Sequence, residues 1–219
     1  MNYTLVFHIL GLILRVEAVL MLPAAVIGIA TRGGDGSAFL LAAGITLAVG
    51  QALVMLPAKN VKMQARDGFA AVALSWIFLS LFGALPYVFS GVLPNYADAV
   101  FETVSGFTTT GASVLTFIEG QPLGVLFWRA QTQWMGGVGV LVLALALVPR
   151  LGEGSVYLMR AESPGPIKSK LTPKVGDTAK ILYSIYIGLT VGEVLCLRLA
   201  GMPWFDAVIH AFTTISTGG

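Results

Sequence analysis

Five long apolar stretches constrain the fold of this chain more than any other feature of its sequence. Each is long enough for a helix that crosses a bilayer, which needs roughly 20 apolar residues. Hydrophobic residues make up 56% of the 219 positions and charged residues only 11%, too apolar a composition for a soluble domain. We therefore expect an all-α polytopic membrane protein, with spans over residues 5–30, 38–57, 69–90, 123–148 and 178–199.

The charged residues that remain indicate how the spans are oriented. The loops over 58–68 and 150–180 are rich in Lys and Arg, whereas residues 90–121 carry acids and no base. Basic loops face the cytoplasm by the positive-inside rule, so the N-terminus is expected inside. A net charge of +2 gives no reason to expect a nucleic-acid partner, and the single cysteine excludes an internal disulfide.

A Thr/Gly motif follows a segment too short to cross the membrane. It reads Phe-Thr-Thr-Thr-Gly-Ala over 107–112, and a full span comes after it. A related motif, Thr-Thr-Ile-Ser-Thr-Gly-Gly, occupies 213–219. This order of span, half-span, loop and return span is the outline of a helix–pore-loop–helix repeat of potassium-channel type.

The two motifs align when Asp98 is placed over Asp206, which also pairs Thr109 with Thr217. Both aspartates are expected to cap the start of a short pore helix. The second copy stops in its loop, as expected of an N-terminal piece of a longer protein. The predicted organisation is a leading helix pair (1–58), a complete repeat (59–149), a cytoplasmic loop (150–177) and a truncated second repeat (178–219).

The chemistry of the loops favours a cation. A helix that ends near mid-membrane directs its negative dipole end there, and irregular backbone at that depth is tolerated where it lines a watery path. Rings of neutral oxygens replace the hydration shell of a potassium-sized ion. The alternative is a Thr-rich turn between two packed helices. The predicted filter residues are Thr108, Thr109, Thr110, Gly111, Ala112, Ser216, Thr217, Gly218 and Gly219, with potassium at Thr109, Thr110, Gly111, Thr217 and Gly218.

Several further residues have two possible roles. Glu102 and His210 occupy equivalent places on the two pore helices, where they either hydrogen-bond behind the loops or concentrate cations at the mouth. Arg129 either reaches the outer interface or meets an acid such as Glu119. The small residues over 136–139 favour helix packing over a hinge, and they lack the spacing of a dinucleotide-binding fingerprint.

These motifs resemble the TrkH/TrkG/KtrB superfamily of potassium transporters, most closely its TrkH branch. The matching stretches are 101–112, 133–139 and 210–219. The resemblance implies four helix–pore-loop–helix units around a pseudo-fourfold pore, a homodimer in the lipid bilayer of the bacterial inner membrane, and a cytosolic TrkA-like nucleotide-binding subunit. It implies no enzyme activity and no covalent cofactor; the bound ligand is the potassium ion.

The functional prediction is therefore potassium uptake through a channel-like pore with a Thr/Gly selectivity filter. A cation-coupled secondary transporter with broken helices is the first alternative, although repeats in that class are often inverted. An intramembrane serine protease is disfavoured, because Ser105 lacks the preceding glycine of a nucleophile motif and His210 lies on a pore helix.

Overall fold

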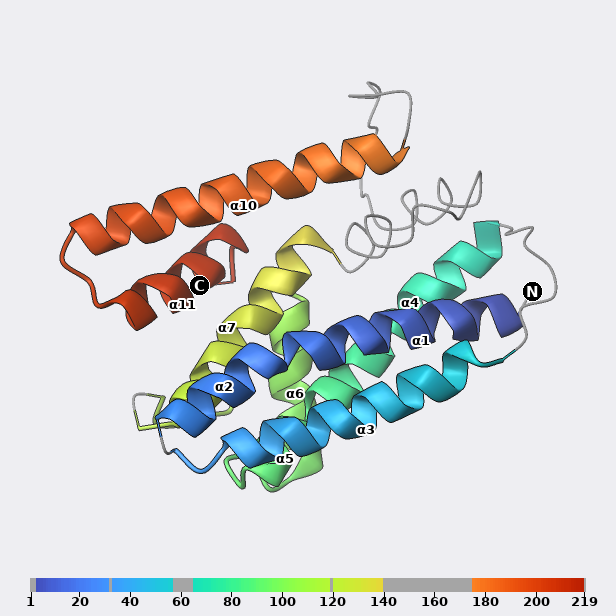
Figure 1. Cartoon of the computed structure of the whole chain (residues 1–219), viewed down its shortest axis with the longest axis horizontal. Coiled ribbons are helices and arrows are strands. Elements are labelled where there is room, and N and C mark those ends of the chain that lie inside the picture. Colours follow the sequence, from blue (N-terminus) through green and yellow to red (C-terminus); the bar gives the residue numbers. More distant parts are fainter. Residues whose placement is uncertain (1–2, 32, 57–64, 119, 140–174, 219) are drawn as a thin grey trace.

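The computed structural model describes residues 3–31, 33–56, 65–118, 120–139 and 175–218. Within these ranges every regular element is an α-helix (Figure 1). Most of the predicted cytoplasmic loops, and residues 140–148 of the stretch 123–148, lie outside them. The helices are α1 Tyr3–Leu20, α2 Leu22–Ala30, α3 Gly36–Val54, α4 Ala65–Gly83, α5 Leu85–Phe89, α6 Tyr96–Phe107, α7 Leu123–Val138, α10 Val175–Leu199 and α11 Trp204–Ile215.

The chain is a multi-pass membrane protein. Four segments are long and apolar enough to span a bilayer, namely Tyr3–Ala30, Gly36–Val54, Asp67–Phe89 and Lys180–Leu199, and they confirm four of the five predicted spans. Of the fifth predicted span, residues 140–148 lie outside the described part of the chain, and within that part α7 ends before Gly139. This residue has φ 76° and ends α7, because a left-handed backbone cannot continue a right-handed helix.

Prolines interrupt two of these spans. The first is divided at Met21, two residues before Pro23. The third is divided at Ala84, two residues before Pro86. Proline lacks an N–H and its ring clashes with the preceding turn, so a helix ends or bends just before it. The equivalent helix of the second repeat, α10, contains no proline and is continuous.

The leading helices pack as a pair through glycines. Helices α1 and α3 lie side by side (Figure 1), and a Cβ built on Gly11 would lie 2.6 Å from the carbonyl oxygen of Gly50. Small residues allow two membrane helices to bring their backbones this close.

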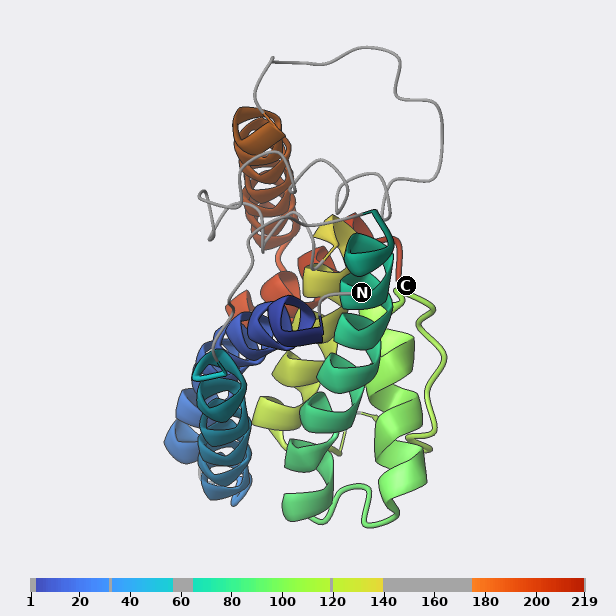
Figure 2. The same ribbon diagram turned by 90° about the vertical axis from the view of Figure 1, so that its right-hand side faces the viewer.

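Helix α7 is held in place by contacts from three other elements. Trp128 is fully buried and its Nε1 donates to the carbonyl of Gly83 at 3.0 Å. The buried carboxylate of Asp35 accepts from the backbone N–H of Val125 at 3.1 Å, so it caps α7 from another helix. Helix α6 contacts both α4 and α7, and Figure 2 shows α4 and α6 side by side.

The repeat seen in the sequence is present in the helices. Pore helices α6 and α11 both have 12 residues, and both begin and end 108 positions apart. The predicted capping role of Asp98 and Asp206 is wrong. The caps are Asn95, whose side chain accepts from Ala97 N, and Pro203, and the aspartates lie in the first turn instead. Their charge still complements the positive end of each helix dipole there.

Candidate ion-binding site

The loops that follow α6 and α11 meet each other. A Cβ built on Gly111 would collide with the carbonyl oxygen of Gly218, and Gly111 has φ 78°. Only glycine satisfies both the left-handed backbone and the close approach. The C-terminal ends of two pore helices therefore converge on one point, where their negative dipole ends favour a cation.

The two loops share one backbone conformation. After α6 the N–H of Thr110 donates to Ser105 O at 2.9 Å, and after α11 the N–H of Gly218 donates to Thr213 O at 2.9 Å. In each loop the residue before that donor is a left-handed threonine, Thr109 with φ 55° and Thr217 with φ 59°. These bonds are those of a Schellman motif, which normally places glycine at the left-handed position.

A left-handed threonine is unusual because its branched Cβ makes this backbone unfavourable, and such outliers cluster at functional sites. Two of them at equivalent positions show that both loops repeat the same unfavourable backbone conformation. They also support the alignment of Asp98 with Asp206, which pairs these two threonines. Gly219, the predicted partner of Gly111, lies outside the described residues.

The carbonyl oxygens of the first loop fall into two groups, those that accept a hydrogen bond and those that do not. The carbonyl of Gly111 accepts from Arg129 Nη2 at 3.1 Å, and the carbonyl of Ala112 accepts from Ser105 Oγ at 2.5 Å. The carbonyls of residues 108–110 accept no hydrogen bond from the part of the chain that the structure describes. The hydroxyls of Thr108 and Thr110 lie 2.8 Å apart on the exposed side of the loop.

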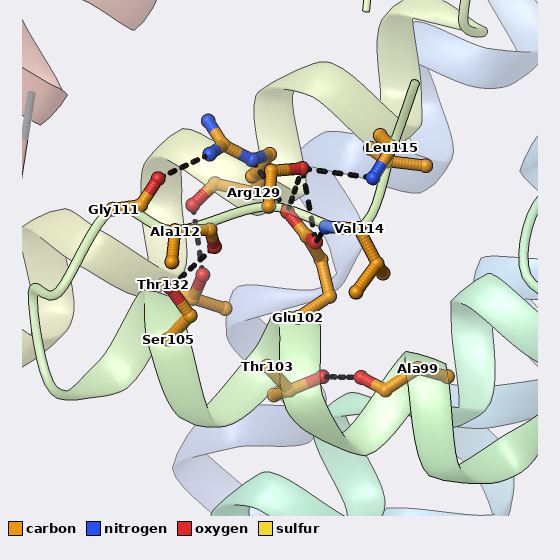
Figure 3. A network of polar contacts seen from close by, with 11 residues as sticks. Ala99, Glu102, Thr103, Ser105, Gly111, Ala112, Val114, Leu115, Arg129 and Thr132 are labelled. Carbon is orange, nitrogen blue, oxygen red and sulfur yellow. Dashed lines mark hydrogen bonds and ion pairs between the residues drawn. The ribbon is translucent and has the colours of Figure 1, made fainter. Parts of the chain in front are cut away.

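A buried ion pair lies behind this loop (Figure 3). Arg129 Nε donates to Glu102 Oε1 at 2.6 Å, and the Glu102 side chain is 1% exposed. The same carboxylate accepts from Ser113 Oγ at 3.0 Å and from Val114 N at 2.9 Å. The predicted hydrogen bonding of Glu102 behind the loop is confirmed. The partner of Arg129 is this pore-helix acid, whereas Glu119 lies outside the described residues.

The second loop has different support. His210, at the position equivalent to Glu102, is exposed, and no described residue hydrogen-bonds to its ring. The hydrogen bond expected of His210 is therefore absent from this part of the chain. A Cβ built on Gly218 would instead lie 2.9 Å from the amide carbon of Gln133, whose Oε1 is buried and has no partner among the described residues.

Two glycines of α7 bring this helix against both loops. A Cβ on Gly136 would collide with the carbonyl of Phe107 at the end of α6. A Cβ on Gly137 would lie 2.9 Å from Ser216 Cβ after α11. The predicted packing role is confirmed for both. Trp134, on the preceding turn, stacks on Phe212 at 5.2 Å between ring centroids and holds α11 against α7.

Aromatic residues begin both pore helices at equivalent positions. Tyr96 and Trp204 are exposed, and Arg198 lies 5.4 Å from the ring of Trp204. Amphipathic rings of this kind are enriched where a membrane meets water. The Tyr96 hydroxyl donates to Leu81 O at 2.9 Å, and partial burial raises the pKa of this phenol.

The chemistry of the site is that of neutral oxygens. Among the described residues no cluster of three His, Cys, Asp or Glu side chains is placed to hold a metal ion. Ser105 donates to a loop carbonyl, and no described Ser–His pair of the protease type is found. Sequence reasoning missed the roles of Ser105, Ser113 and Gln133. The signal available for Arg129 was its opposite charge to Glu102, since Arg129 is the single charge of α7 and a charge in an apolar segment needs a partner.

Comparison with known proteins gives one consistent result. The family model described as TrkH, cation transport protein, matches residues 35–219. The Trk system potassium uptake protein TrkH of Halomonas elongata is 45% identical over this whole chain and 46% of the relative, and TrkH of Escherichia coli K12 is 41% identical with the same coverage.

The crystal structure of the potassium transporter TrkH from Vibrio parahaemolyticus superposes with a TM-score of 0.81 at 36% identity. That match covers 100% of this chain and 44% of the other. The chain thus spans about half the length of the relatives it matches.

Proposed function

Because this chain belongs to the TrkH family of cation transport proteins, we propose that it takes part in potassium uptake through a channel-like pore. Its relatives bear the name of potassium uptake proteins. The proposed filter contains the loops 108–112 and 216–219. The ion is the transported substrate, and no covalent step belongs to the proposal.

One observation carries this proposal: two strained Thr loops of identical backbone converge at the C-terminal ends of two pore helices. Thr109 and Thr217 supply the left-handed turns, and Gly111 lies against Gly218. Convergent neutral carbonyls at the negative ends of helix dipoles stabilise a cation that has shed its water. A simple packing turn would not need a left-handed β-branched residue in both copies.

The shared direction of the two units favours a pore over a secondary transporter with broken helices. Inverted repeats are common in that transporter class, and their loops enter from opposite sides. In this chain both loops follow the C-terminal end of their helix and meet there, which parallel units around an axis would produce.

The wider assembly follows from the same proposal. We place the protein in the bacterial inner membrane with its N-terminus in the cytoplasm, as a homodimer in lipid. Residues 1–58 form a leading pair, 59–149 one complete unit, 150–177 a cytoplasmic loop and 178–219 the start of a second unit. A TrkA-like subunit on the cytosolic side is the proposed regulatory partner.

Growth of potassium-uptake-deficient bacteria at low potassium tests this function. The full-length protein that contains these residues should restore growth, and Gly111→Ser should raise the potassium concentration required. Restored growth with an indifferent Gly111→Ser variant would show that loop 108–112 is only a turn. A wild-type protein that moves no potassium would overturn the proposed substrate.

A further inference from the structure

We propose that Arg129 is a positioning residue for the first filter loop, which it holds through the carbonyl of Gly111. The inference rests on the proposed function and specifies which oxygens of the loop serve it. The guanidinium fixes the end of the loop, so that the three threonine carbonyls before it are left to face the ion. Glu102 orients the guanidinium and neutralises its charge.

The contacts of Arg129 make it a bridge between a helix and a loop. Its Nε donates to Glu102 at 2.6 Å, and its Nη2 donates to Gly111 O at 3.1 Å (Figure 3). The planar guanidinium offers several donors in a fixed fork, so both bonds set its orientation. The Arg129 side chain is 14% exposed, and this partial burial keeps water from competing for its donors.

Glu102 ties the same bridge to the far side of the loop. Its carboxylate accepts from Val114 N at 2.9 Å and from Ser113 Oγ at 3.0 Å, just after the filter residues. Ser105, one turn along α6, donates to the carbonyl of Ala112. The loop from residue 111 to 114 is therefore fastened at successive positions, whereas residues 108–110 are fastened only at their hydroxyls and N–H groups.

These hydrogen bonds determine in which direction the carbonyl groups of the loop point. An oxygen that accepts from a guanidinium is directed at Arg129 and is a weak ligand for a second cation beside it. The carbonyls of Thr108, Thr109 and Thr110 have no such partner among the described residues. We accordingly assign ion coordination in this loop to those three carbonyls, and a structural role to the carbonyl of Gly111.

The pair with Glu102 explains how a positive group is tolerated beside a cation path. A lone guanidinium near the filter would repel potassium, since charges interact strongly where water is scarce. Paired with a carboxylate 2.6 Å away, it contributes a directed donor with little net charge. The second loop has His210 where the first has Glu102, so the bridge belongs to the first loop.

The test is ion discrimination in the full-length protein, with three variants compared at measured membrane abundance. They are Arg129→Gln, Arg129→Lys and, as the matched control, Arg198→Gln at the exposed end of α10. Rubidium uptake gives the half-saturating concentration and the maximal rate, and sodium competition gives the discrimination ratio. A merely structural role would lower abundance and maximal rate but leave half-saturation and discrimination unchanged.

We expect Arg129→Gln to weaken potassium-over-sodium discrimination about tenfold, the loss typical of one charged hydrogen bond. Arg129→Lys, which reaches Glu102 or Gly111 but not both, should fall in between, and Arg198→Gln should match wild type. If Arg129→Gln does not reach the membrane, Arg129→Lys decides alone. Unchanged discrimination in the deciding variant overturns the inference, whereas a wild-type protein without uptake overturns the proposed function and this inference with it.

Discussion

The two pore helices end in the same backbone turn, yet different side chains hold the loops that follow them. The first loop is fastened by Arg129, Glu102 and Ser105, while the second lies against the neutral amide of Gln133. This difference shows that the backbone turn and the side chains that hold it in place are determined separately. The turn is a local property that both copies keep, and the support behind it is a tertiary property that each unit builds from what its neighbours offer.

The largest expected effect tests the contact between the loops. Gly111→Ala introduces a Cβ that collides with Gly218, at a cost of about 1–3 kcal/mol from overpacking, besides about 1–2 kcal/mol from the left-handed backbone. Gly91→Ala is the matched control, because its φ is 75° and no atom lies near its Cβ. We expect Gly111→Ala to lose uptake at low potassium and Gly91→Ala to retain it. If the two variants grow equally well at low potassium, the contact between Gly111 and Gly218 is not needed for uptake.

A second comparison replaces the equivalent residues Glu102 and His210 by Gln. Glu102→Gln leaves Arg129 partly buried without its counter-charge and should cost about 3 kcal/mol. His210→Gln, at an exposed position, should stay within about 0.5 kcal/mol of wild type. Thermal unfolding in detergent measures both.

The double variant Glu102→Gln, Arg129→Gln sharpens this comparison. Because it removes both charges, it should be more stable than Glu102→Gln alone. A double variant at least as unstable as the sum of the two single variants would show that the two residues act independently rather than as a pair.

The glycines of α7 give an intermediate effect that differs between the loops. Gly136→Ala forces a Cβ against the backbone of Phe107 and should cost about 2 kcal/mol, since that backbone cannot easily move. Gly137→Ala brings its Cβ to 2.5 Å from the Tyr186 hydroxyl and 3.0 Å from the backbone Cα of Ser216, which is less close than the approach at Gly136, and should cost less. Gly188→Ala on α10, with open space around it, is the control and should not destabilise. A larger loss of stability in Gly137→Ala than in Gly136→Ala would show that α7 packs more tightly against the second loop than against the first.

The smallest expected change in stability comes from replacing either of the two left-handed threonines. Replacing Thr109 or Thr217 by glycine relieves about 1–2 kcal/mol of backbone strain, while the added freedom of the unfolded chain opposes it by about 0.4–1 kcal/mol. We expect a net stabilisation of about 0–1.6 kcal/mol, equal at the two sites, in chemical denaturation of the purified protein. Unequal changes would show that the loops differ in backbone as well as in support.

Near-neighbour patterns allowed much of the fold to be predicted. Four of the five spans, the packing of Gly136 and the repeat of pore helices follow from hydropathy, the run of small residues and the alignment of Asp98 with Asp206. The caps were predicted wrongly, because Asn95 and Pro203 lie three residues before the aspartates and begin the helices first. A capping residue depends on where the helix starts, which hydropathy locates only approximately.

By itself, the sequence determined that this chain lies in a membrane and carries two Thr/Gly loops after short helices, since apolar length and local turn chemistry act over a few residues. Only the tertiary structure decided that the loops meet at Gly111 and Gly218, and that Arg129 pairs with Glu102. Those contacts join residues far apart in the chain. A lone charge in an apolar segment indicates that a partner is needed, but packing of the helices selects which one.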